Sequence, residues 1–92
     1  MRLYIVTYDI PCDKRRKKTA NLLEGYGQRV QLSVFECFLN PQKYEELKQR
    51  LERVVKLEED SIRFYPLSGR TLADVELWGG VPLSAPPTSQ II

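Results

Sequence analysis

The order in which hydrophobic periodicity changes along the chain constrains its fold more than any other feature. Alternation with a period of two, typical of strands, covers Arg2–Asp9, and helical spacing follows over about Asp13–Glu24. Alternation returns over residues 28–39, where the pattern does not locate the turn or bulge that would divide it. A second helical stripe starts at Pro41 and precedes a strand over Ser61–Leu67. This order, β-α-β-β-α-β, predicts an α+β fold of the ferredoxin-like type.

Both predicted helices have recognisable boundaries. Asp13 is a good N-cap for the first helix, which should end at Gly25 or Gly27 because glycine often closes a helix. Asn40 and Pro41 supply an N-cap and a first-turn proline for the second helix.

The C-terminal part is expected to add one strand and a tail. Leu72–Trp78 follows a Ser-Gly turn and predicts an extra C-terminal strand. From Gly79 onwards, glycine and three prolines predict a flexible tail. We therefore expect one ferredoxin-like domain over residues 1–80 and a flexible C-terminal tail over residues 81–92.

Two helices cover only one face of such a sheet. The other face is expected to carry Tyr, Val, Phe and Leu side chains, which a second copy would bury most economically across a two-fold axis. A chain of 92 residues also has a thin core for its surface. We therefore expect a homodimer in which Leu72–Trp78 pairs with the partner's sheet edge.

Five consecutive cations, residues 14–18, occupy the first turns of the first helix, just after a strand that ends at Asp9. Cations there are unfavourable by about 0.3–1 kcal/mol each, because the helix dipole is already positive at that end. A polyanion bearing phosphates would turn them into a binding site. The first 43 residues hold eight cations and four anions, whereas residues 44–92 hold six cations and eight anions. The alternative is a solvated basic face.

The residue inventory excludes several kinds of chemistry. The chain has no histidine, and its two cysteines, Cys12 and Cys37, are too few and too far apart for a zinc cluster. Phosphodiester cleavage would therefore need a metal-activated water, or a carboxylate or tyrosinate base. No apolar stretch approaches membrane-spanning length, so we expect a cytoplasmic protein with no membrane partner.

Several separated motifs occur together over about residues 1–80: Tyr8-Asp9-Ile10, Asp13-Lys14-Arg15-Arg16-Lys17-Lys18, Tyr26-Gly27, Arg29-Val30-Gln31, Ser33-Val34-Phe35-Glu36 and Arg63-Phe64-Tyr65-Pro66-Leu67. In this combination the chain resembles the Cas2 family, the small CRISPR-associated partners of the CRISPR integrase in spacer acquisition. The resemblance implies a homodimer whose two first-strand aspartates face each other across the axis. Some family members are described as metal-dependent endonucleases acting on RNA or DNA, and others as non-catalytic bridges that grip duplex DNA.

The resemblance also implies roles for individual residues. Asp9 matches the family's metal-site aspartate, which makes it the candidate catalytic residue, and Tyr8 is the aromatic residue before it. The candidate nucleic-acid-binding residues are Arg15, Arg16, Lys18 and Arg29. Tyr8 and Phe35 are the candidate supporting residues. Lys18 stands where the family can have arginine, which loses the bidentate guanidinium fork.

The implied cofactor is Mg²⁺ or Mn²⁺. Mg²⁺ is typically held by one or two carboxylates, with water and phosphate oxygens at its other positions, so one Asp9 from each protomer would suffice. Without the resemblance, Asp9 reads as a strand-end carboxylate that caps the following turn. Alternation places Arg29 on the same face as Gln31 and Phe35, so Arg29 fits an interface role as well as a phosphate role. Phe35 fits packing better than base stacking.

Four functions stay open from the sequence. They are a metal-dependent nuclease of spacer acquisition, a DNA-bridging adaptor whose Asp9 pair is structural, a toxin-type endoribonuclease of the same fold, and a ferredoxin-like RNA-binding module. The last is the weakest, because no third-strand Lys/Arg-Gly-Phe-like motif occurs.

Overall fold

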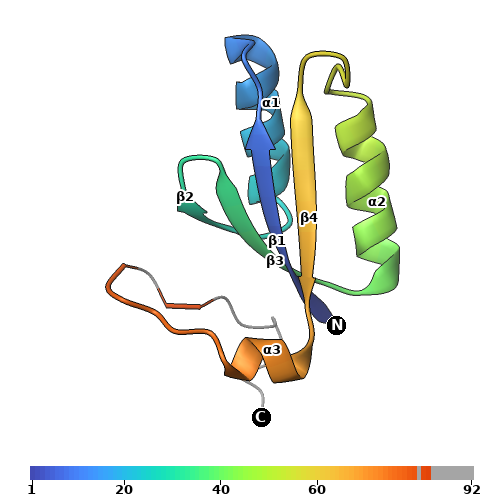
Figure 1. Cartoon of the computed structure of the whole chain (residues 1–92). Coiled ribbons are helices and arrows are strands. Elements are labelled where there is room, and N and C mark those ends of the chain that lie inside the picture. The colour runs from blue at the N-terminus through green and yellow to red at the C-terminus, as the bar shows by residue number, and fades with distance from the viewer. Residues whose placement is uncertain (81, 84–92) are drawn as a thin grey trace.

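The computed structural model describes residues 1–80, 82 and 83 (Figure 1). Its elements are β1 (Arg2–Asp9), α1 (Asp13–Glu24), β2 (Gln28–Gln31), β3 (Val34–Leu39), α2 (Pro41–Glu52), β4 (Ser61–Leu67) and α3 (Gly69–Ala73). The sheet has the strand order β2-β3-β1-β4, and all its neighbouring strands are antiparallel. With α1 and α2 on one face, this arrangement confirms the ferredoxin-like prediction.

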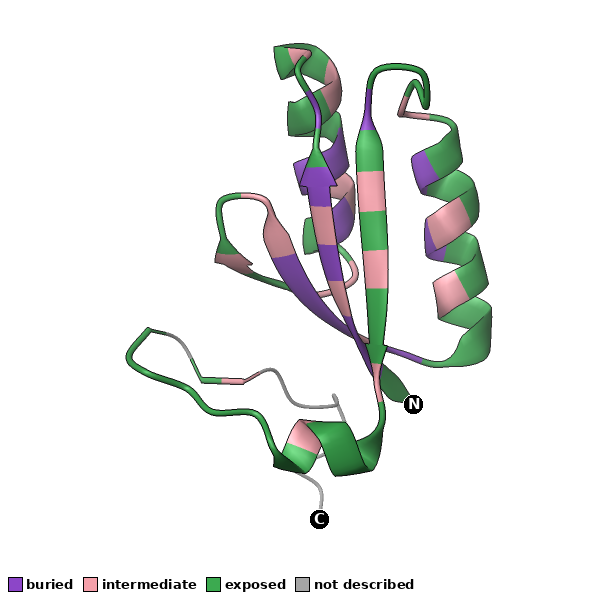
Figure 2. Cartoon of the chain, viewed as in Figure 1, coloured by how far each residue is buried: buried purple, intermediate pink, exposed green. Residues whose placement is uncertain are grey.

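β1 runs through the middle of the sheet and divides its side chains between two faces. Tyr4, Val6 and Tyr8 are buried beneath the helices, and Figure 2 shows the buried positions on the inner edge of α2 and along β1 and β3. The Tyr4 ring stacks on Tyr44 of α2, with 4.0 Å between ring centroids. Ile62 and Phe64 of β4 pack half-buried against the core. The other buried core side chains come from α1, β3, α2 and the residue after β1: Ile10, Ala20, Leu23, Phe35, Cys37, Leu39, Leu47 and Leu51.

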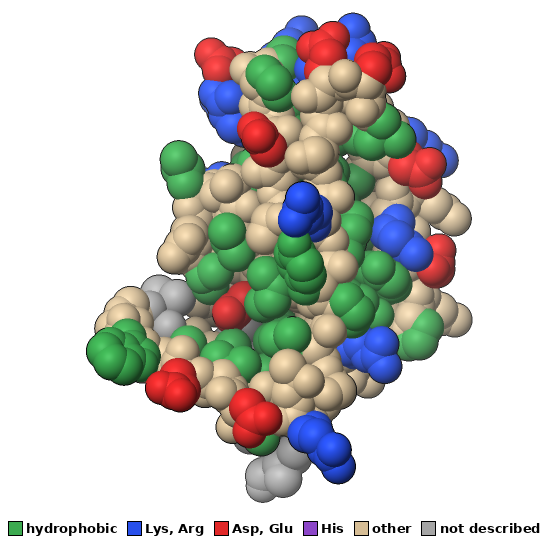
Figure 3. Space-filling model, in the orientation of Figure 1, with side chains coloured by type: hydrophobic (Ala, Val, Ile, Leu, Met, Phe, Trp, Pro, Cys, Tyr) green, Lys and Arg blue, Asp and Glu red, His purple; other side chains and the backbone are tan. Residues whose placement is uncertain are grey.

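The other face of the sheet has no helix over it. Figure 3 shows hydrophobic side chains gathered over this face. In register across β3, β1 and β4 lie Glu36, Ile5 and Tyr65, of which Ile5 is half-buried and Tyr65 is 43% exposed. The uncovered face is therefore largely apolar, as the sequence predicted.

Gly27 is required where the chain turns from α1 into β2. A Cβ at this position would lie 2.3 Å from the backbone oxygen of Glu36 and 2.5 Å from the Cys37 sulfur. Only glycine allows the two backbones to approach this closely. The approach starts the β2–β3 hairpin and helps to bury the Cys37 thiol, whose pKa is raised to about 12 by that burial.

The break in the alternating stretch over residues 28–39 lies at Leu32 and Ser33, which form the hairpin turn. The register shifts between Arg29, which pairs with Phe35, and Gln31, which pairs with Val34. Arg29 therefore shares the helix-covered face with Phe35, whereas Gln31 lies on the uncovered face. The prediction that plain alternation keeps Gln31 beside Arg29 was wrong, because a bulge interrupts the strand between them.

Two further local predictions need correction. Leu72–Trp78 does not form the extra C-terminal strand: Ser68 caps α3 by accepting a hydrogen bond from the Thr71 N–H at 3.1 Å, and Leu72 belongs to that helix. Residues 75–78 then follow without regular structure, and Trp78 is 90% exposed. Of the predicted tail over residues 81–92, only residues 82 and 83 are among those described.

The second correction concerns the start of α1. Its N-cap position is Cys12, which makes no side-chain cap, and Asp13 is the first helical residue. The bounds of α1 are as predicted, as is the start of α2, where Asn40 accepts a hydrogen bond from the Lys43 N–H at 2.8 Å. Among the described residues, no helix combines the length and apolar character needed to cross a membrane.

Candidate nucleic-acid and metal site

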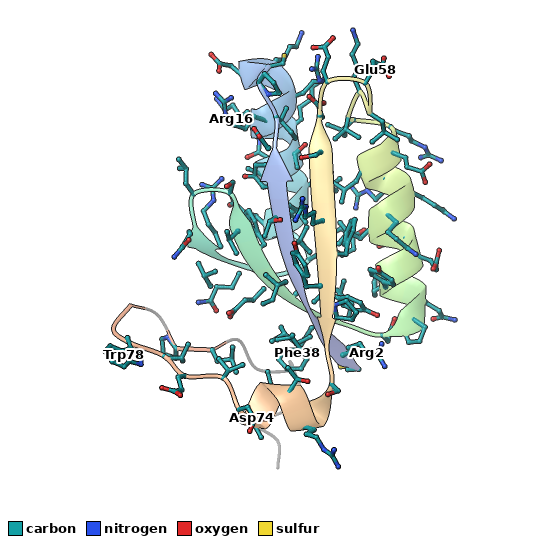
Figure 4. The ribbon with its side chains drawn as sticks, viewed as in Figure 1. Arg2, Arg16, Phe38, Glu58, Asp74 and Trp78 are labelled. Atoms are coloured by element: carbon teal, nitrogen blue, oxygen red, sulfur yellow. The ribbon has the colours of Figure 1, made fainter. Side chains whose placement is uncertain are left out.

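A pocket forms where β1 ends and α1 begins, beside the β2–β3 hairpin. We call it the strand-end pocket; its lining includes Tyr8, Asp9, Arg16, Lys17, Arg29 and Leu32. It brings together the predicted metal residue and two of the predicted phosphate-binding cations, which come from three different elements. Figure 4 shows Arg16 beside the end of β1, at the end of the molecule where α1 starts.

Arg16 is anchored to the loop that precedes its own helix. Its Nη1 donates to the backbone oxygen of Ile10 at 2.9 Å and to that of Pro11 at 3.4 Å, and its Nη2 donates to the Asp13 carboxylate. The side chain remains 44% exposed. These bonds hold one edge of the guanidinium, so the group is positioned before any ligand arrives.

Arg29 reaches the same pocket from the hairpin. Its Nη2 donates to the Tyr8 hydroxyl at 3.4 Å, and its guanidinium lies 5.3 Å from the centroid of the Phe35 ring. The Tyr8 hydroxyl in turn donates to the backbone oxygen of Leu32 at 3.3 Å. Tyr8 and Phe35 are thus buried supports that orient Arg29, and Phe35, fully buried, is packed as predicted.

Asp9 is exposed at the last position of β1, in register with Ser61 of β4. In the part of the chain that the structure describes, no group of three or more Cys, Asp or Glu side chains is placed to hold a metal ion. One chain therefore offers Asp9 without a complete set of protein ligands. That arrangement still suits Mg²⁺, which keeps several waters and takes substrate phosphates as further ligands.

Comparison with known proteins identifies the family. A family model described as CRISPR associated protein Cas2 matches residues 1–75. The chain is also 61% identical, over the full length of both, to a protein named CRISPR-associated endoribonuclease Cas2 3 from Synechocystis sp.. The chain belongs to the Cas2 family.

Solved structures agree with this assignment. The crystal structure of Streptococcus pyogenes Cas2 matches with a TM-score of 0.73 at 40% identity, covering 84% of this chain and 99% of that one. A chain of a partial Cas6-RT-Cas1–Cas2 complex matches with a TM-score of 0.77 at 36% identity, covering 95% of each chain. The resemblance seen in the sequence motifs is thereby confirmed at the level of the Cas2 family and its fold.

Arg15 has a different place in this Cas2 chain from its neighbour Arg16. Its Nε and Nη2 donate to both carboxylate oxygens of Asp60, at 2.8 and 3.0 Å, and Nη2 also reaches Glu59 at 3.2 Å. The Asp60 side chain is fully buried, and it accepts a further bond from the Lys56 N–H at 2.9 Å. Arg15 therefore ties the start of α1 to the loop before β4, and we leave it out of the proposed phosphate-binding set.

Lys18 also lies apart from the strand-end pocket. It faces α2 instead, in a groove lined by Arg50 and Arg53. The five cations of the basic run therefore point to different surfaces, as five successive helical residues must.

Sequence reasoning missed one residue that lines this Cas2 site and one residue that keeps Arg15 out of it. Lys17 lines the strand-end pocket, and its membership of the basic run was the available signal. Asp60 accepts hydrogen bonds from Arg15 and so keeps that guanidinium away from a ligand. No local pattern links two residues so far apart in sequence, and only the fold brings them together.

Proposed function

We propose that this chain is a nucleic-acid-binding subunit of CRISPR spacer acquisition whose strand-end pocket holds backbone phosphates. The observation that carries the proposal is that Arg16 and Arg29 line the same exposed pocket. Each is held by an uncharged group: Arg16 by the backbone oxygen of Ile10, and Arg29 by the Tyr8 hydroxyl. Charge that is positioned without being fully neutralised is what a phosphate diester needs. One of the similar structures is a Cas1–Cas2 assembly, which supports the integrase as a partner.

The binding proposal is tested by exchanging Arg16 for glutamine. Arg16→Gln should weaken binding to two unrelated DNA duplexes alike, and should lower the slope of log affinity against log salt by about one, because one phosphate contact is lost. Arg16→Lys should restore the slope, since it restores the charge. Arg70→Gln, an exposed cation of α3, is the control for net charge and should leave the slope unchanged. A loss confined to one duplex would contradict recognition of the backbone.

We further propose that Asp9, together with Asp9 of a second protomer, holds Mg²⁺ or Mn²⁺ beside the bound phosphate. The pocket fits such an ion because the exposed carboxylate of Asp9 shares the lining with cations that would hold the phosphate ligands. Two further carboxylates, Asp13 and Glu24, also line it, and Asp13 is paired with Arg16. When bound, the ion would supply a water activated for attack on phosphorus. Arg16 and Arg29 would orient the phosphate, and Tyr8 would keep Arg29 in place.

This second proposal separates a nuclease from a DNA-bridging adaptor. If Asp9 takes part in hydrolysis, purified Asp9→Asn protein should lose cleavage of labelled RNA or duplex DNA in Mg²⁺ or Mn²⁺ by at least about tenfold, because one of the metal's carboxylates is gone. The matched control is Asp74→Asn, at the opposite end of the molecule (Figure 4). Equal cleavage by wild-type and Asp9→Asn protein would remove the catalytic proposal and leave the adaptor.

A further inference from the structure

A second basic groove lies at the outer surface where α1 and α2 meet. We call it the inter-helix groove; it is lined by Lys18, Asn21, Leu22, Arg50, Arg53 and Val54. The core positions of the same two helices, such as Leu23 and Leu47, are buried on the side towards the sheet. The groove therefore opens to solvent on a different surface from the uncovered sheet face.

The charges of this groove are unbalanced. Its lining holds three cations and no carboxylate, and within the described part of the chain neither Lys18 nor the Arg53 side chain has a polar partner. By contrast, the two lysines of α2 are each paired with a carboxylate: Lys43 with Glu46 at 3.4 Å and Lys48 with Glu45 at 2.8 Å. Like charges that face one another across a groove repel, so folding alone does not favour this arrangement.

Arg50 is held in place by Tyr26, but most of its N–H donors remain available to a ligand. Its Nη1 donates to the Tyr26 hydroxyl at 2.9 Å, and its guanidinium lies 5.6 Å from the centroid of the Tyr26 ring. Tyr26 in turn donates to Glu46, which also accepts from Lys43. A guanidinium has five N–H donors, so most of those of Arg50 remain for a ligand, and the tyrosine limits the conformational freedom that binding would cost.

We propose that the inter-helix groove is a second phosphate-binding site, at which Lys18, Arg50 and Arg53 hold the backbone of the nucleic acid bound at the strand-end pocket. The inference rests on the proposed function and extends it to another surface. The two sites adjoin along α1: Arg16 and Lys17 line one, Lys18 lines the other, and Asn21 lines both. A single bound nucleic acid would therefore contact both sites along α1.

The test compares double variants in the full-length protein. Lys18→Gln/Arg53→Gln removes two groove charges while keeping Arg50 and its tyrosine partner. Lys48→Gln/Arg70→Gln is the matched control, since it removes the same net charge at positions outside both sites. Binding of a labelled mixed-sequence DNA duplex is measured against salt, with Arg16→Gln/Arg29→Gln as the strand-end reference. Nε–Hε NMR signals of the arginines, followed during duplex titration, report where the duplex lies.

If the groove binds backbone, its variant should lose several-fold in duplex affinity and about two units of salt slope, while the control loses neither. The Arg50 and Arg53 signals of the wild type should move with the duplex. Groove and control variants that behave alike, while the strand-end reference still weakens, would overturn this inference and leave the proposed function standing. If the strand-end reference also binds like wild type, the proposed function fails as well. Binding of polyglutamate to the wild type and the groove variant is measured as well. If the groove variant loses polyglutamate binding but keeps duplex binding, the groove is a surface for an acidic protein and the inference is overturned.

Discussion

At the scale of single residues, neighbours in sequence have separate roles. Arg15 forms an ion pair with the buried carboxylate of Asp60. Arg16 lines the strand-end pocket, and Lys18 lies in the inter-helix groove. The type of residue explains the role of Arg15, because only a planar guanidinium meets both oxygens of Asp60 at once. The charge run predicted cationic surface correctly, but it could not assign each cation, because its partners come from segments distant in sequence.

Gly27 offers a test of the closest backbone approach in the fold. We expect Gly27→Ala to lower the free energy of unfolding by about 1–3 kcal/mol, because the added Cβ overlaps the β3 backbone and the Cys37 sulfur. Denaturant titration followed by circular dichroism measures the loss. Gly69→Ala is the matched control, since nothing lies within 4 Å of a Cβ at that position. Equal stabilities for the two variants would contradict the close approach.

At the scale of elements, Arg15 and Asp60 connect α1 to the loop between α2 and β4. The hydrogen bonds from Arg15 and from the Lys56 N–H hold the pKa of Asp60 below its usual value. A depressed carboxyl pKa stabilises the fold fully above the unfolded value of about 3.9, and this contribution is lost as the pH falls through the folded pKa.

The ion pair of Arg15 with Asp60 predicts that the Tm difference between wild type and Asp60→Asn depends on pH. Asp60→Asn should lower Tm by several degrees at neutral pH, because Arg15 would lose its buried partner. The difference from wild type should shrink as the pH falls below about 4 and on through the lower pKa of folded Asp60, where the wild-type carboxylate takes up a proton. Thermal unfolding at a series of pH values measures it, with Asp74→Asn as the control. A constant difference across that range would show that the ionised pair does not stabilise the fold.

The elements themselves were largely predictable, and the exceptions have local causes. Hydrophobic periodicity predicts α1, α2, β1 and β4, because each buries one face or lies in the middle of the sheet. The segment Leu72–Trp78 misled because its apolar residues suit a strand, whereas the Ser68 cap starts a helix first. In the site, Asp9 and Arg16 followed from the motif and the basic run. The resemblance also named Arg29, but alternation alone does not reveal the bulge that keeps it on the helix-covered face while Gln31 lies on the other.

At the scale of the whole molecule, the uncovered sheet face and residues 75–78 leave apolar surface exposed. Ile5 and Tyr65 lie on that face, and Leu77 and Trp78 are 51% and 90% exposed beyond α3. Such surface in a small chain is typical of a subunit interface. We propose a homodimer in which two sheet faces meet and residues 75–78 lie against the partner.

Truncation tests this assembly. A chain ending after Asp74 keeps α3 but lacks residues 75–78, and light scattering should show a weaker dimer or aggregation because the sheet faces lose part of their cover. A chain ending after Gly80 is the matched control and should dimerise like the full chain. If both truncated chains dimerise equally well, the dimer does not use residues 75–78.

The bulge between Arg29 and Gln31 decides which face of the sheet Arg29 occupies. If the pairing of Gln31 with Val34 continued along β2 without the bulge, Arg29 would lie opposite Glu36. That slip of one residue would take a cation out of the strand-end pocket and place its charge on the largely apolar uncovered face. The extra residue of this four-residue strand is therefore what keeps Arg29 with Phe35 while Gln31 lies on the other face, and a sequence that paired without it would lose the pocket without losing the hairpin.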